Sequence, residues 1–200
     1  ASGPNSLTIT NVETLVAGAG NDTVTLGAAA VGVTYNLAGG TDTLQLSSAG
    51  NNNVTVNSIE TILGGTSDDT ISMVLSTVGA TLSGSGGDDT LIGSNGADTL
   101  IGGSGADYFV FRDTAQSSAT VFDTITDFVV GQDKLVFEGL GNGNFSMVST
   151  FTNTGDAQAK WDAATNILLV DTDGNGVAEM KLTLVAATSD GLSASDFQWT

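Results

Sequence analysis

The feature that most constrains the fold is a nine-residue period. Three consecutive nonapeptides, which begin with a Gly-rich turn, place Asp sixth and end in a short strand-forming run, occupy Gly84–Ile92, Gly93–Ile101 and Gly102–Val110. Weaker copies, also with Asp at the sixth place, occupy Ala17–Thr25, Leu37–Gln45 and Gly64–Ser72. Two units complete one coil of parallel β-structure, and about eleven half-coils account for residues 8–110. The period therefore predicts an all-β solenoid.

The residue types within each unit point to a cation. Gly at places one, two and four allows positive φ, which turns backbone carbonyls toward a common centre. Turns one coil apart stack, so Asp22 is expected near Asp42, and Asp89 near both Asp69 and Asp107. Bare carboxylates at a strand spacing of roughly 4.8 Å repel one another. A hard divalent cation with oxygen ligands between each pair converts this repulsion into stabilisation.

Composition narrows the function. The chain has no Cys and no His, which excludes an imidazole base, a thiol nucleophile and a Cys/His zinc site. It carries 22 acidic residues against four basic ones and a net charge of −18. Such a chain is not expected to bind nucleic acid, and it repels itself when compact unless cations neutralise it. We also expect no membrane span, because no apolar run is long enough.

Residues 84–110 match the GGxGxDxUx pattern and resemble the RTX (repeats-in-toxin) family. This resemblance implies a right-handed parallel β-roll that binds several Ca²⁺ ions through sixth-place carboxylates and turn carbonyls. The ligand positions that it implies are Asp22, Asp42, Asp69, Gly84, Gly86, Asp89, Gly93, Asn95, Asp98, Gly102, Gly103, Ser104, Gly105 and Asp107. Asp98 is less regular, because its expected neighbours one coil away are Ala80 and Gln116. Glu13 and Glu60 hold the same place in degraded copies, either as ligands or as solvated charges.

The sequence changes character after residue 111, where Gly becomes scarcer and strand-like stretches lengthen. Tyr108–Asp113, Asp123–Phe128 and Gly131–Leu135 resemble the C-terminal region of serralysin-type proteases. The resemblance implies an RTX roll over residues 1–111, followed by a β-rich cap and type I secretion signal region over residues 112–200. It also implies that Asp123 and Asp133 bind calcium, whereas turn capping is the ordinary alternative for Asp123 and Asp127.

Asp171–Gly176 matches the first half of an EF-hand loop. The twelfth place, where a bidentate Glu belongs, is Leu182. Strand-like residues flank the segment at Ile167–Val170 and Val177–Leu184. A hairpin turn is therefore the favoured interpretation, with a lone calcium site as the alternative.

Two features concern export. Leu192–Thr200 resembles the uncleaved C-terminal signals of type I secretion substrates, and Ala1–Asn5 lacks the charged and apolar regions of a signal peptide. Together with the repeats, they imply a secreted or cell-surface module, the C-terminal part of a larger protein. Its partners would be calcium and, during export, a type I ABC transporter. Folding would follow when calcium binds outside the cell.

Catalysis is not expected from these residues, because neither an HExxH zinc site nor a Ser–His pair is present. Two non-enzymatic alternatives remain. One is an assembly or anchoring module of a surface-layer protein or adhesin, with self-association or a cell-surface partner, which calcium-dependent self-association would support. The other is ice binding, since Thr follows the sixth-place acid at Thr14, Thr23, Thr43, Thr61, Thr70, Thr90 and Thr99. These Thr are expected on two sides of the roll, with one row interrupted by Tyr108, and thermal hysteresis would test the idea.

Overall fold

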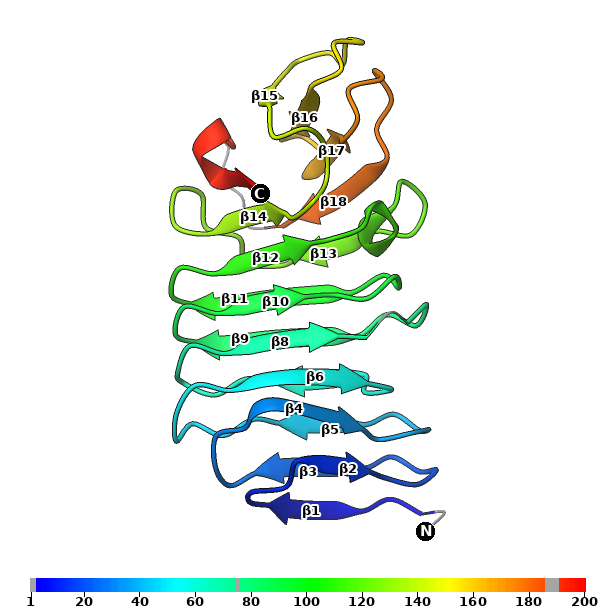
Figure 1. Cartoon of the computed structure of the whole chain (residues 1–200), viewed down its shortest axis with the longest axis vertical. Helices are drawn as coiled ribbons and strands as arrows, with labels where there is room; N and C mark the ends of the chain where they lie inside the picture. Colours follow the sequence, from blue (N-terminus) through cyan, green and yellow to red (C-terminus); the bar gives the residue numbers. More distant parts are fainter. Residues whose placement is uncertain (1–2, 75, 186–190) are drawn as a thin grey trace.

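A computed structural model describes residues 3–74, 76–185 and 191–200. The described residues form strands, two 3₁₀ turns and no α-helix. The turns are η1 (Thr114–Ser117) and η2 (Ala194–Asp196). Two sheets, of eleven and eight strands, run along the molecule and face each other (Figure 1). No helix in the part of the chain that the structure describes is long and apolar enough to cross a membrane.

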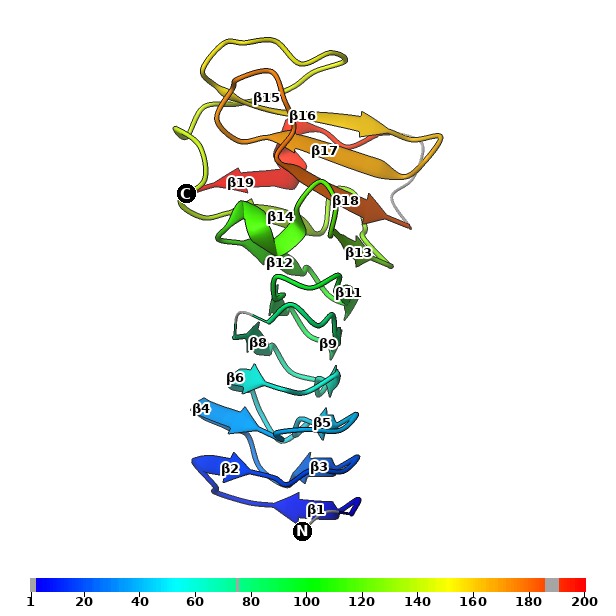
Figure 2. The same ribbon diagram turned by 90° about the vertical axis from the view of Figure 1, so that its right-hand side faces the viewer.

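The roll is built by strands that alternate between the two sheets. The first sheet contains β1 (Ser6–Ile9), β3 (Thr23–Leu26), β5 (Thr43–Gln45), β7 (Thr61–Leu63), β9 (Thr81–Gly86), β11 (Thr99–Ser104) and β13 (Asp123–Ile125). The second contains β2 (Thr14–Val16), β4 (Val31–Asn36), β6 (Asn53–Asn57), β8 (Thr70–Met73), β10 (Thr90–Ile92), β12 (Tyr108–Phe111), β14 (Lys134–Phe137) and β19 (Phe197–Trp199). Neighbouring strands are parallel, and the coils rise along the long axis (Figure 2). The predicted parallel β-roll is confirmed.

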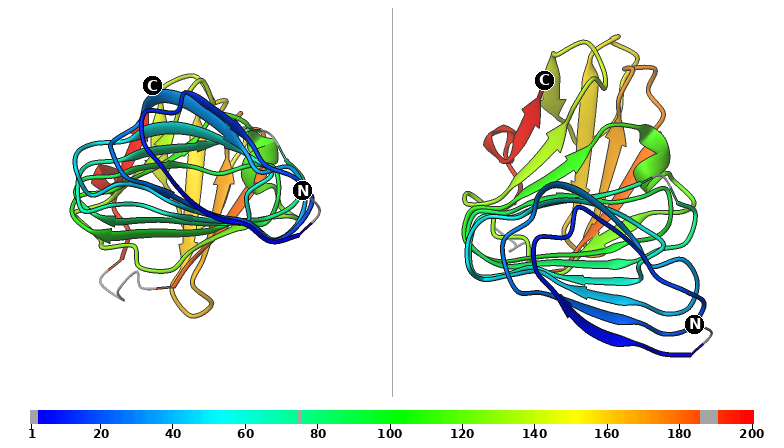
Figure 3. Two further views of the ribbon diagram at one scale, coloured as in Figure 1. Left: turned by 90° about the horizontal axis from the view of Figure 1, so that it is seen from below. Right: turned by 60° about the horizontal axis from the view of Figure 1, so that its bottom comes forward.

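The core lies between the sheets and follows from the alternation of strand side chains. The middle residue of each nonapeptide strand points inward, so Leu91, Leu100 and Phe109 are fully buried. The same inward column continues through Ile62 and Leu82 in other coils. Seen from below, the coils stack on one another with a gradual twist (Figure 3). Apolar burial at every coil therefore holds the sheets together.

A different arrangement covers the C-terminal end of the roll. β18 (Met180–Leu184) continues the first sheet in parallel with β13, and β17 (Ile167–Asp171) and β16 (Ala157–Asp162) add antiparallel strands before β15 (Phe145–Met147). The second sheet ends when β19 pairs with β14. Because β13 and β14 continue both sheets beyond residue 111, the two regions share the same sheets. The division at residues 111 and 112 stays a prediction.

The outward faces of the two sheets differ. On the first sheet a Thr row runs in register over seven strands: Thr23, Thr43, Thr61, Thr81, Thr99, Thr124 and Thr183. On the second sheet the corresponding row reads Thr70, Thr90, Tyr108 and Lys134. The predicted division of Thr residues between two sides is therefore confirmed, and Tyr108 interrupts only the second.

Candidate metal centre

The sixth-place residues form two rows at the starts of the strands. Row one precedes the strands of the first sheet and contains Asp22, Asp42, Glu60, Ala80, Asp98 and Asp123. Row two precedes the strands of the second sheet and contains Asn52, Asp69, Asp89, Asp107 and Asp133. Every Asp of both rows is buried. The structure thus gathers the predicted acids in two stacks rather than in one site.

Within each row, one carboxylate oxygen accepts the backbone N–H of the residue one coil earlier. The N–H of Asp22 donates to Asp42 Oδ1 at 2.7 Å, the N–H of Asp69 to Asp89 Oδ1 at 2.7 Å, and the N–H of Asp89 to Asp107 Oδ1 at 2.9 Å. These contacts confirm the neighbours predicted for the five acids. Each charge-assisted hydrogen bond fixes one oxygen and the register of adjacent coils.

The surroundings of Asp98 agree with prediction on one side only. The N–H of Ala80 donates to Asp98 Oδ1 at 2.7 Å, as predicted. On the other side the N–H of Asp98 donates to Asp123 Oδ1 at 2.8 Å, so Asp123, and not Gln116, is the next member of the row. Gln116 instead donates from Nε2 to the carbonyl of Gly93 at 2.8 Å. The segment after the last nonapeptide departs from the nine-residue repeat. The acid that follows Asp98 in row one, Asp123, therefore lies further along the chain than the repeat predicts.

The second oxygens of several row acids have no hydrogen-bond partner among the described residues. Oδ2 is buried without a hydrogen bond at Asp22, Asp42, Asp89 and Asp123. A buried carboxylate oxygen without a donor is costly, because the water that solvated it is gone. Carboxylate and carbonyl oxygens are the ligands that calcium prefers, and a cation satisfies such an oxygen without needing a proton. The donor set therefore fits calcium.

Burial raises the pKa values of six row carboxyls: Asp42, Asp89, Asp98, Asp107, Asp123 and Asp133. Desolvation is the largest cause at each position. It raises the pKa of Asp89 to about 7, with smaller contributions from the charges of Asp107 and Asp69. The pKa of Asp107 rises to about 6 and that of Asp123 to about 8. Burial also raises the pKa of Asp42, Asp98 and Asp133. Without a cation, these groups resist ionisation.

The predicted turn residues lie beside these acids. In row two the turn Gly84–Asp89 stacks directly on Gly102–Asp107, and the N–H of Gly87 donates to the carbonyl of Ser104 at 2.9 Å. A Cβ on Gly84 or Gly102 would overlap the carboxylate of its own turn. Glycine is needed there because the acid occupies the space. Gly86, Gly103, Ser104 and Gly105 lie in the same pair of turns, whereas Gly93 and Asn95 belong to a turn of row one.

The two Glu residues behave differently. Glu60 takes its place in row one, where its Oε2 accepts the N–H of Asp42 at 2.7 Å. Glu13 is exposed on the terminal coil. Calcium binding by Glu13 or Glu60 stays a prediction, but Glu60 has a defined hydrogen-bond partner, Asp42, within its row.

Asp127 has a role that the repeat pattern does not reveal. Its two oxygens accept the N–H groups of Gly102 and Gly103 at 3.0 and 2.8 Å. The carboxylate therefore clamps the last nonapeptide turn from the segment after β13. Turn capping is the ordinary alternative that the sequence suggests for Asp127, and the sequence offers no signal for its distant partners, Gly102 and Gly103.

Asp127→Asn is expected to lower the free energy of unfolding by about 1–2 kcal/mol. The amide retains one acceptor oxygen but presents an NH₂ group to the second backbone donor. A urea titration in saturating calcium measures the change. Asp162→Asn, at an exposed hairpin position, is the matched control. Equal stabilities of the Asp127 variant and the unchanged protein would show that the clamp contributes nothing.

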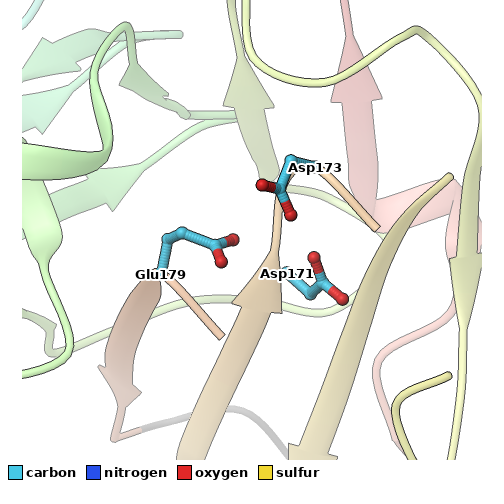
Figure 4. A group of neighbouring side chains, drawn as sticks. All are labelled: Asp171, Asp173 and Glu179. Atoms are coloured by element: carbon cyan, nitrogen blue, oxygen red, sulfur yellow. The ribbon is translucent and has the colours of Figure 1, made fainter. Parts of the chain in front are cut away.

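The EF-hand-like segment forms a hairpin turn between β17 and β18, as favoured from the sequence. Carboxylate oxygens of Asp171, Asp173 and Glu179 lie within 4.8 Å of one another (Figure 4). All the oxygens of these carboxylates accept hydrogen bonds. Asp171 accepts the N–H groups of Gly174 and Gly176, both at 2.7 Å, and that of Asn175 at 3.2 Å. The oxygens of Asp173 and Glu179 also have donors. Unlike the row acids with an orphaned Oδ2, this turn is satisfied by its own donors, and calcium binding there stays a prediction.

A parallel β-roll with stacked sixth-place acids beside Gly-rich turns defines the class of RTX-type calcium-binding repeat modules. Comparison with known families agrees. The RTX calcium-binding nonapeptide repeat matches residues 10–30, and the Peptidase M10 serralysin C-terminal family matches residues 31–197. The second match covers most of the chain, so the chain belongs to the serralysin C-terminal family.

Comparisons with individual proteins add one structural likeness. No curated protein matches the sequence. Among solved structures, the chain is similar to a subunit of the mannuronan C5-epimerase of Azotobacter vinelandii, determined in solution. The two share 21% sequence identity over 80% of each chain, with a TM-score of 0.44.

Proposed function

We propose that this chain is a calcium-binding module that folds when calcium fills the stacked turns. The observation that carries the proposal is the set of orphaned, buried Oδ2 atoms at Asp22, Asp42, Asp89 and Asp123. A net charge of −18 opposes compaction, and bound divalent ions reduce it where the acids are closest. Binding to the folded state alone makes the binding free energy a folding free energy.

The proposed setting is export by a type I transporter, with the chain as the non-catalytic C-terminal part of a larger secreted or cell-surface protein. Where free calcium is very low, the chain would stay extended and thread through the transporter with its C-terminus first. Outside, calcium at the roughly 0.1–1 mM affinity of extracellular modules would fill the roll. The C-terminal strands and the strongest repeats would emerge first, so folding would proceed toward the N-terminus. Family membership and the acidic composition support this setting.

Equilibrium dialysis against calcium, with magnesium in a parallel series, tests the binding. We expect several calcium ions per chain at millimolar calcium and no comparable uptake of magnesium. Magnesium requires a more rigid octahedral shell and releases its water reluctantly, so carbonyl-lined turns suit it poorly. A chain that takes up no calcium at 10 mM would contradict the proposal.

A further inference from the structure

The row acids fall into two groups that the sequence does not distinguish. In the first group, which we call open turns, the sixth-place Oδ2 accepts no hydrogen bond from the described residues. In the second group, closed turns, Oδ2 accepts the N–H of the second residue of its own turn. The open turns of the nonapeptides end at Asp22, Asp42, Asp89 and Asp107, and the closed turns end at Asp69 and Asp98.

Both oxygens are occupied in the closed turns. Asp69 accepts the N–H of Gly65 on Oδ2 at 2.8 Å and the N–H of Asn52 on Oδ1 at 2.7 Å. Asp98 accepts the N–H and the hydroxyl of Ser94 on Oδ2 at 2.5 and 3.0 Å. Hydrogen-bond donors already occupy the side of these oxygens from which a cation would have to coordinate them. These carboxylates therefore need no metal, and a metal there would have to displace hydrogen bonds of similar strength.

Backbone conformation separates the same groups independently. The fourth residue has a left-handed φ in all four open turns: +144° at Gly20, +146° at Gly40, +106° at Gly87 and +138° at Gly105. Neither closed turn has a left-handed φ at that place, although Gly96 of the Asp98 turn is also a glycine. The turn state is thus a property of the folded chain rather than of the residue type alone.

Open turns also occur as adjacent pairs. The turns at Asp22 and Asp42 are neighbours in row one, and the turns at Asp89 and Asp107 are neighbours in row two. A cation between two stacked turns takes oxygens from both, so a complete site requires both turns to be open. The pairs give two such sites, one near the N-terminal end of the roll and one at its last nonapeptides.

Asp133 and Asp123 are the remaining aspartates of the two rows. Asp133 is closed by the N–H of Val129 on Oδ2 at 2.8 Å. Asp123 has an orphaned Oδ2, but it stacks on the closed turn of Asp98, and the carbonyl of Gly93 in that turn already accepts from Gln116. Asp123 therefore lacks the second open turn of a paired site.

We propose that calcium occupies the two paired open turns, at Asp22 with Asp42 and at Asp89 with Asp107, and that Asp69 and Asp98 are metal-independent caps of their own turns. The inference rests on the proposed calcium binding and assigns its sites within the rows. The turns at Asp69 and Asp98 would then form without calcium. Row one would bind its ion near the N-terminal end of the roll, and row two would bind its ion at the last nonapeptides.

The test compares Asp→Asn variants by ion count and by stability. In equilibrium dialysis at saturating calcium, Asp42→Asn and Asp89→Asn are each expected to lose one bound calcium ion per chain. Asp69→Asn and Asp98→Asn, the matched variants at closed turns, are expected to keep the full count. Urea titration adds a second readout. In saturating calcium the closed-turn variants should unfold at lower urea than the unchanged protein although they keep every ion, because an NH₂ group then faces a backbone donor.

Each outcome decides the assignment. Loss of an ion from Asp69→Asn or Asp98→Asn, or an unchanged count in either open-turn variant, would overturn it. If Asp89→Asn does not fold, Asp107→Asn replaces it, because Asp107 supplies the other carboxylate of the same paired site. Absence of calcium uptake by the unchanged protein would instead overturn the proposed function itself.

Discussion

Phe137→Ala is expected to lower the free energy of unfolding of the calcium-saturated chain by about 3–5 kcal/mol. Phe137 is fully buried on β14, where the roll meets its C-terminal cover. Its ring centroid lies 4.6 Å from that of Trp199, 5.7 Å from Phe111 and 6.3 Å from Phe197. Removing the ring leaves a cavity and removes an aromatic contact from both Phe197 and Trp199 of β19. A urea titration followed by far-UV circular dichroism measures the loss.

The matched control is Val129→Ala, at a position that is 46% exposed on the same segment of chain. Its effect should stay within about 0.5 kcal/mol. Limited proteolysis supplies a local readout, because β19 pairs with β14 and should be cleaved faster once the ring is gone. A loss below 1 kcal/mol for Phe137→Ala would show that the aromatic cluster is not part of the cooperative unit.

In the absence of calcium, acidification from pH 8 to pH 5 is expected to stabilise the fold. The folded-state pKa values of Asp107, Asp89 and Asp123 are raised to about 6, 7 and 8, mainly by desolvation. Unfolded Asp has a pKa of about 3.9, so between these values the folded state holds more protons than the unfolded state. Stability from these groups is complete below the unfolded pKa and is lost as the pH rises through the folded values. If the pKa of each of these three carboxyls were raised by only one, the free energy of unfolding would change by about 4 kcal/mol in total.

Saturating calcium should reverse this dependence. Calcium binds the deprotonated carboxylates, so its apparent affinity falls as protons compete for them. Far-UV circular dichroism in chelator and urea titrations in 10 mM calcium, each at pH 5, 6, 7 and 8, separate the two regimes. Asp89→Asn should flatten the dependence of the β signal on pH in chelator, whereas Glu13→Gln, on the exposed terminal coil, should leave it unchanged. A β signal in chelator that rises with pH would contradict the account.

The repetitive part of the fold could be predicted because one local rule is repeated. Apolar residues at the eighth place, such as Leu91, Leu100 and Phe109, face the core on every half-coil. Those of every second half-coil pair within one sheet, and this fixes the register of β10 and β12. The sixth-place acids follow from the same period. The number of residues per coil was enough to predict that Asp22 stacks on Asp42.

The nine-residue repeat no longer predicts the structure where the sequence departs from it. Between Asp107 and Asp123 the η1 turn and its flanking residues break the nine-residue count, so Asp123 rather than Gln116 follows Asp98. The bidentate contact of Asp127 with Gly102 and Gly103 depends on the path of this irregular segment, which no local pattern specifies. The difference between the turns of Gly87 and Gly96 is also set by packing, since both carry glycine at the fourth place.

The most direct test of calcium-triggered folding is a calcium titration followed by far-UV circular dichroism, with magnesium as the control. The account predicts a chain with little β signal in chelator. That signal should rise cooperatively between about 0.1 and 10 mM calcium and be lost again when chelator is added. Magnesium should not reproduce the rise. A chain that shows its full β signal in chelator at pH 7.5 and does not respond to calcium would contradict the central claim.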